Sequence, residues 1–246
     1  MSDYGPETYG ERIADVYDEL YAERFGEQAE EIATALAGLA RGGRALELGI
    51  GTGRIALPLQ ARGIEVQGID SSAQMATKLR AKPGGERIPV TIGDFADMGV
   101  EGEFSVVFVV FNTFFGLLSQ EEQVRCFRNV SKHLAADGVF VIEAFVPDQT
   151  RHVRGQSTSV TRVEADSVGL DVSRHDPVSQ RVTSQHLLIS ESGVRLYPVQ
   201  LRYAWPAELD LMAQLVGLRL RERWGGWKGE RFTATSGSHV SIYERG

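Results

Sequence analysis

The chain has 246 residues, enough to bury a sizeable core in one large domain or in one domain with an insertion. Its net charge of −7 at pH 7 disfavours a general nucleic-acid surface or an anionic-membrane surface. The single cysteine, Cys126, excludes an internal disulfide framework, and the lack of a long apolar run or leader pattern predicts a cytoplasmic protein.

The first part of the chain, residues 1–40, predicts a helical lid. Between residues 8 and 21, apolar side chains such as Ile13 and Tyr17 recur at helical spacing and predict an amphipathic helix that covers another part of the molecule. A second helix is expected over residues 28–40. The lid therefore precedes the glycine-rich stretch at residues 45–54.

That stretch is Ala45-Leu46-Glu47-Leu48-Gly49-Ile50-Gly51-Thr52-Gly53-Arg54. A short apolar run that ends in glycines at alternate positions predicts a buried strand turning tightly into a helix, here over residues 54–61. A dinucleotide fingerprint would need a third glycine at the position of Arg54. Glu47 disfavours a pyrophosphate at this turn and favours a cationic or zwitterionic nucleoside.

A second strand is predicted over residues 65–70, and it ends at Asp70. Asp70 follows Gly49 by about twenty residues, the spacing at which nucleotide-binding α/β units place a carboxylate on ribose hydroxyls. The alternative is that Asp70, which precedes Ser71, caps the next helix. Both uses compete for the same oxygens.

Two further strands end in polar turns. The strand over residues 87–92 leads into Gly93-Asp94-Phe95, for which a plain turn is the alternative interpretation. The strand over residues 104–111 is apolar almost throughout, as a central strand buried on both faces should be. Ligands of open parallel sheets lie beyond the carboxyl ends of the strands, so Asn112 should border the reaction site.

A capping box, Ser119 to Glu122, opens a helix, and a fifth strand over residues 139–145 carries Glu143 near its end. The βα alternation then breaks, and the next segment predicts antiparallel strands that form the wall of a substrate pocket or a dimer surface. A helix after Pro206 and two alternating strands complete the chain. The expected antiparallel strands are residues 160–163, 170–175, 181–189 and 195–201, and the last two strands are residues 218–224 and 238–243.

Taken together, the glycine turn, Asp70 and Gly93-Asp94-Phe95 resemble the motifs of class I S-adenosylmethionine-dependent methyltransferases. The resemblance implies an α/β fold with a Rossmann-like seven-stranded sheet and helices on both faces. It places the core at residues 41–150 and 205–246, with an inserted antiparallel sheet at 151–204. The likeness extends to small actinobacterial methyltransferases of antibiotic pathways, such as N,N-dimethyltransferases acting on nucleotide-linked amino sugars.

The resemblance also implies a set of site residues, and no acidic metal cluster of the catechol methyltransferase kind stands out in the sequence, so no metal is expected. Catalytic candidates are Tyr17, Asn112 and Glu143, and substrate contacts are expected from Tyr9, Phe114, Phe115 and Phe145. The residues expected to bind S-adenosylmethionine are Tyr17, Glu47, Gly49, Ile50, Gly51, Gly53, Arg54, Asp70, Ser71, Met75, Asp94, Phe95 and Asn112.

The predicted function is methyl transfer to a small-molecule acceptor of a biosynthetic pathway, with nitrogen as the preferred acceptor atom. O-methylation, a peptide acceptor and a non-catalytic cofactor-binding protein are the alternatives. A lone histidine is more often structural than catalytic, so His152, His175 and His186 are kept only as candidate bases. A substrate phosphate would have four arginines of the insertion available: Arg151, Arg154, Arg174 and Arg181. No nucleic-acid or membrane partner is expected, and a homodimer would use the insertion.

Overall fold

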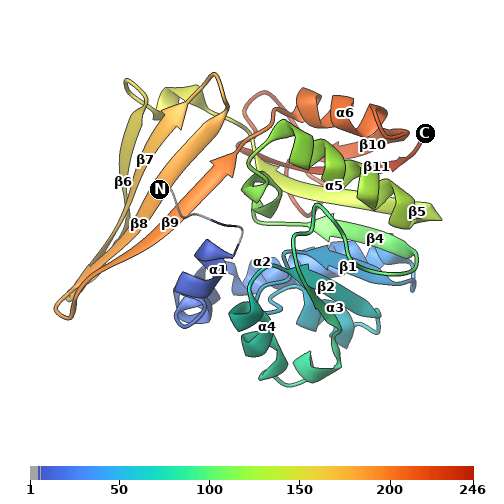
Figure 1. Ribbon diagram of the computed structural model, residues 1–246, viewed down its shortest axis with the longest axis horizontal. Helices are drawn as coiled ribbons and strands as arrows, with labels where there is room; N and C mark the ends of the chain where they lie inside the picture. Colours follow the sequence, from blue (N-terminus) through green and yellow to red (C-terminus); the bar gives the residue numbers. More distant parts are fainter. Residues whose placement is uncertain (1–4, 6) are drawn as a thin grey trace.

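The computed structural model describes Gly5 and residues 7–246, apart from the side chains of residues 19–25. Two sheets organise this part of the chain (Figure 1). A seven-stranded sheet carries the helices, and a four-stranded antiparallel sheet projects from it. The predicted α/β class, the Rossmann-like sheet and the inserted antiparallel sheet are confirmed.

The seven strands of the core sheet are β1 (Ala45–Leu48), β2 (Val66–Asp70), β3 (Val90–Ile92), β4 (Phe104–Val109), β5 (Leu134–Phe145), β10 (Leu218–Trp224) and β11 (Ser238–Arg245). The inserted sheet contains β6 (Gln156–Val163), β7 (Ser167–Asp176), β8 (Arg181–Ser190) and β9 (Gly193–Arg202). The helices are α1 (Thr8–Ile13), α2 (Tyr17–Ala40), α3 (Ala56–Ala61), α4 (Ala73–Arg80), α5 (Gln120–His133) and α6 (Pro206–Gln214), with 3₁₀ turns at Gly85–Arg87, Thr113–Gly116 and Gln149–Arg151.

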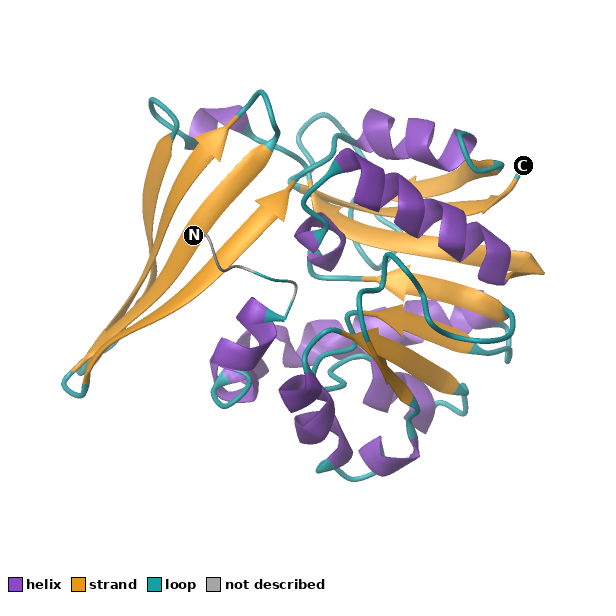
Figure 2. Cartoon of the chain, in the orientation of Figure 1, coloured by secondary structure: helices purple, strands orange, loops and turns teal. Residues whose placement is uncertain are grey.

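The core sheet has the order β10-β11-β5-β4-β1-β2-β3. Its central strands pair in parallel, and β11 joins β5 antiparallel. The two faces of the sheet form separate apolar cores, one with α5 and α6 and the other with α2 and α3. Figure 2 shows helices on both sides of this sheet. Coverage on both faces explains why β4 is apolar almost without interruption.

The N-terminal helices differ from the sequence prediction. The first helix ends at Ile13, and the second begins at Tyr17 and continues without a break to Ala40. Ile13 and Ala14 are buried against Met75 and Tyr197, so the chain changes direction where it meets both α4 and the inserted sheet. Local periodicity carries no information about this tertiary contact. No helix in the described part of the chain is both long and apolar enough to span a membrane.

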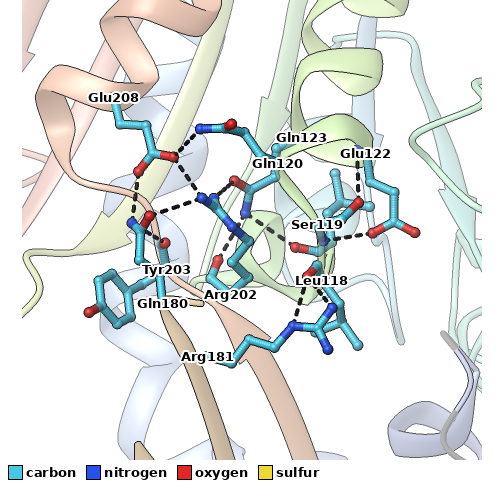
Figure 3. Close-up of polar contacts among 11 residues, drawn as sticks. Leu118, Ser119, Gln120, Glu122, Gln123, Gln180, Arg181, Arg202, Tyr203 and Glu208 are labelled. Carbon is cyan, nitrogen blue, oxygen red and sulfur yellow. Dashed lines mark hydrogen bonds and ion pairs between the residues drawn. The ribbon is translucent and has the colours of Figure 1, made fainter. Parts of the chain in front are cut away.

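A buried polar network joins the inserted sheet to the core (Figure 3). Arg202, which ends β9 and is only 7% exposed, donates to Gln123 Oε1 at 2.6 Å, to Gln180 Oε1 at 3.0 Å and to Glu208 Oε1 at 2.8 Å. Gln123 in turn donates to the backbone carbonyl of Arg202. Helices α5 and α6 therefore hold the base of the inserted sheet through one guanidinium.

We predict that Arg202→Met destabilises the protein by about 3–5 kcal/mol, because Glu208, whose side chain is only 16% exposed, is left without its cation. Burial raises the pKa of Glu208, but hydrogen bonds from Gln180, Arg202 and Gln120 outweigh it and hold the pKa below its ordinary value. The stabilisation is therefore complete above the ordinary glutamate pKa and is lost as the pH falls through the lowered folded-state value.

Urea unfolding as a function of pH tests the contribution of the Arg202–Glu208 pair to stability. The stability gap between wild type and Arg202→Met should narrow in acid. Arg219→Met, which breaks the exposed pair with Glu244, is the matched control and should change stability by less than about 1 kcal/mol. Equal effects of the two variants would contradict the assigned role.

Candidate functional site

A cavity of about 980 Å³ lies where the carboxyl ends of β1, β2 and β4 face the inserted sheet. One half is lined by the turns after the parallel strands, the position at which open α/β sheets bind ligands. The other half is lined by one face of the inserted sheet. The first helix closes one side through Tyr9 and Gly10.

The glycine turn has the geometry that its spacing predicts. Gly49, Gly51 and Gly53 all have positive φ, at 74°, 57° and 81°. A Cβ at Gly53 would lie 2.2 Å from Leu79 Cδ1, so this glycine serves packing. A Cβ at Gly51 would meet nothing within 4 Å, because Gly51 faces the cavity. The bare backbone at Gly51 therefore leaves room for a ligand.

Asp70 holds two backbone groups at once. Its Oδ2 accepts from the Gly51 N–H at 2.7 Å, and its Oδ1 accepts from the Ser72 N–H at 2.8 Å. The Ser72 hydroxyl in turn caps α4 by accepting from the Met75 N–H at 3.2 Å. Burial raises the pKa of Asp70. Each carboxylate oxygen has a second lone pair, so shaping the turn leaves acceptor capacity toward the cavity.

Arg54 provides a cation beside this turn. Its guanidinium lies 4.3 Å from the centre of the Phe111 ring and 5.0 Å from that of Tyr17, and it donates to the Tyr17 hydroxyl. Burial raises the pKa of Glu47 well above its ordinary value, against the lowering effect of Arg54. Glu47 Oε2 is buried and accepts no hydrogen bond from any described residue. Arg54 and the Asp70 carboxylate both line the cavity, and together they suit a zwitterionic ligand.

The backbone after β4 is held in an unusual conformation. Phe111 and Asn112 have φ values of 55° and 64°, in the left-handed region that non-glycine residues seldom adopt. Glu143 Oε2 accepts from the Phe111 N–H at 2.7 Å, and Asn112 Oδ1 accepts from the Phe145 N–H at 2.7 Å. Burial raises the pKa of Glu143. Backbone strain of this kind, maintained by neighbouring groups, clusters at functional sites.

The structure brings most of the predicted site residues to the cavity. Those that line it are Tyr9, Tyr17, Gly49, Gly51, Arg54, Asp70, Ser71, Met75, Asp94, Phe95, Asn112, Glu143 and Phe145.

Five predicted residues do not line it. Phe114 and Phe115 are fully buried, because the turn after Asn112 directs both rings into the core, where Phe114 packs on Phe127 of α5 and Phe115 on Phe145. Ile50 packs into the opposite core, while Glu47 and Gly53 support the turn from within.

Of the polar residues that line the acceptor side, the sequence analysis named His152, His175 and His186 as candidate bases, but it missed the serines and Asp171. Polar side chains at alternate positions of β6, β7 and β8 share the face that lines the cavity. They are Ser157, Ser159, Asp171, Ser173, His175, Ser184 and His186. The signal is present in the sequence as period-two alternation with apolar neighbours, but only the position of the sheet shows that the polar face points inward.

Two histidines lie beside each other at the base of this face, with their rings tilted by 37°. The rings of His152 and His175 lie 4.7 Å apart, and His175 Nε2 shares a hydrogen bond of 3.0 Å with the Tyr203 hydroxyl. Burial lowers the pKa of His152, and His175 lowers it further. His152 is therefore predominantly neutral at pH 7 and can both donate and accept hydrogen bonds.

We predict that Glu47→Gln stabilises the ligand-free protein at neutral pH. A carboxyl group whose folded-state pKa is raised binds more protons in the folded state, so wild-type stability falls as the pH rises above about 4.5. The amide has no charge to desolvate and should lack this fall. Calorimetric melting between pH 4 and pH 8 measures it, with about 2–4 °C expected per kcal/mol recovered. Glu86→Gln, at an exposed position, is the control; parallel pH profiles for wild type and Glu47→Gln would contradict the assignment.

Comparison with known proteins identifies the family. Residues 45–138 match the family model described as a methyltransferase domain. The solved structure of the CcbJ methyltransferase from Streptomyces caelestis is 42% identical, with a TM-score of 0.92 over 98% of this chain and 99% of that one. A cypemycin N-terminal methyltransferase from Streptomyces sp is 29% identical over 100% of both chains. A dTDP-4-amino-2,3,4,6-tetradeoxy-D-glucose N,N-dimethyltransferase from Saccharopolyspora spinosa is 26% identical over 79% of this chain and 81% of its own length.

Three observations support the same family: the fold, the glycine turn held by Asp70, and a relative that is 42% identical along nearly its whole length. The chain belongs to the S-adenosylmethionine-dependent methyltransferases.

Proposed function

We propose that this enzyme methylates an amine of a small-molecule acceptor in a biosynthetic pathway. The observation that carries the proposal is the single cavity of about 980 Å³ that joins the glycine turn to the inserted sheet. A cavity of this size can hold a nucleoside cofactor and a second small molecule together. Names of relatives that act on a sugar amine and on a peptide N-terminus agree with nitrogen as the acceptor atom.

The cofactor half fits S-adenosylmethionine. The open space at Gly51 admits the ligand beside the backbone, and Asp70 accepts hydrogen bonds from the ribose hydroxyls. Met75, Asp94 and Phe95 line the cavity on the side assigned to the adenine. Arg54 faces the carboxylate of the methionine part.

The three catalytic candidates are all tied to a structural partner. The Tyr17 hydroxyl accepts from Arg54, Glu143 accepts from the Phe111 N–H, and Asn112 accepts from the Phe145 N–H. Their role is therefore to shape the site around the reacting atoms. The cofactor, when bound, supplies a methyl group on a positively charged sulfur. A neutral amine already has the attacking lone pair, so this chain's own residues would mainly have to exclude water and orient the amine toward the methyl group.

We predict that Gly51→Val lowers the affinity for S-adenosylmethionine by more than about tenfold, because the side chain both occupies the cavity and strains a residue with positive φ. Titration calorimetry measures the affinity. Gly63→Val is the matched control: Gly63 has φ of 83° and open space around its Cβ position, but it does not line the cavity. Unchanged affinity in folded Gly51→Val protein would reject the cofactor assignment.

The proposed reaction is tested with methyl-labelled S-adenosylmethionine and a panel of amino sugars, other amines, phenols, carboxylic acids and short peptides. Mass gain on amines is the expected result. Labelling of phenols or carboxylates without amines would reject the N-methyl assignment. Labelling of peptides alone would reject a small-molecule acceptor.

A further inference from the structure

The inner face of the inserted sheet presents hydroxyl groups in registered rows. Ser157 pairs with Ser173, and Ser173 pairs with Ser184. Directly opposite side chains of an antiparallel pair lie about 4.5–5.5 Å apart at Cβ, so these three hydroxyls form one row. The adjacent row is Ser159, Asp171 and His186. Such a surface offers donors and acceptors at short intervals, which suits a ligand that itself carries several hydroxyl groups.

Asp171 lies at the centre of the second row. Its Oδ1 is buried, lies 3.5 Å from His186 Nδ1, and accepts no hydrogen bond from any described residue. An oxygen of a carboxylate without a donor is costly when buried. At the base of the same face, His152 Nδ1 is also buried without a partner among the described residues. Both atoms need a ligand group that can donate or accept a hydrogen bond.

The charges around the cavity exclude strong phosphate recognition. Among the described residues that line it there are six carboxylates, no lysine and two arginines, Arg54 and Arg151. Arg54 belongs to the cofactor half, and Arg151 is exposed. Of the four arginines of the insertion that could meet a phosphate, only Arg151 lines the cavity: Arg181 donates to the Leu118 carbonyl at 2.7 Å, and neither Arg154 nor Arg174 is part of the lining.

We infer that the acceptor is a polyhydroxylated amine without a phosphate or nucleotide group, and that Asp171 and His186 bind it directly. This inference rests on the proposed function and narrows its acceptor class. It sets this enzyme apart from the relative whose name specifies a dTDP-linked sugar. A carboxylate accepts well from an ammonium or from a pair of hydroxyls, whereas it repels a diphosphate.

The test compares methyl glucosaminide, UDP-glucosamine and a pentapeptide with a free N-terminus. Binding of each to enzyme saturated with S-adenosylhomocysteine is measured by titration calorimetry, and methylation with labelled cofactor is followed by mass. Methyl glucosaminide should bind and UDP-glucosamine should bind more weakly. Tighter binding of UDP-glucosamine, or binding of the peptide without the glucosaminide, would overturn the inference. Failure of S-adenosylhomocysteine to bind would instead reject the proposed function.

Amino-acid substitutions test which side chains bind the acceptor. Asp171→Asn keeps the shape of the side chain and should weaken methyl glucosaminide binding about tenfold, with S-adenosylhomocysteine affinity unchanged. Asp166→Asn, in the exposed turn after β6, is the matched control and should have no effect. A larger loss in Arg151→Ala than in Asp171→Asn would overturn the inference, because it would indicate an anionic acceptor.

Discussion

The hydrogen bonds of the Asp70 carboxylate are the constraint on which the rest of the site depends. One oxygen fixes the Gly51 N–H and the other fixes the Ser72 N–H, so a single side chain joins the turn after β1 to the start of α4. Helix α4 presents Met75, which packs with Ile13 and Tyr197. The first helix and Tyr197 of the inserted sheet thus pack on a helix whose start is fixed by the same carboxylate that faces the cofactor half of the cavity.

The two halves of the cavity are built from different parts of the fold. The cofactor half is made of turns at the ends of parallel strands, whose positions follow from the core sheet and its two helical layers. The acceptor half is one face of a separate sheet, held at its base by Arg202. Side chains on that face can change without disturbing the core. This separation explains how one fold can serve relatives that are named for different acceptors.

The site keeps several groups in states that folding alone disfavours. Glu47 is buried with an unsatisfied oxygen, and Phe111 and Asn112 have left-handed backbone conformations. The inserted sheet is amphipathic in an unusual sense, since its polar face looks inward and its apolar face looks outward. Departures of this kind from ordinary folding preferences mark surfaces that are shaped for ligands and partners.

The sequence by itself determined the order of the core elements and most of the cofactor half. Glycines at alternate positions after an apolar run, and an acid about twenty residues later, are local patterns whose physical cause lies within one βα unit. The uninterrupted apolar run of β4 likewise reports its burial on both faces.

Only the tertiary structure decided the acceptor half. Phe114 and Phe115 turn into the core, the first helix breaks before Tyr17, and Asp70 both shapes the turn and faces the cavity. Alternation in β6 to β8 identifies two faces but not which of them points inward. That choice depends on how β9 leaves the core through Arg202, a contact between residues distant in sequence.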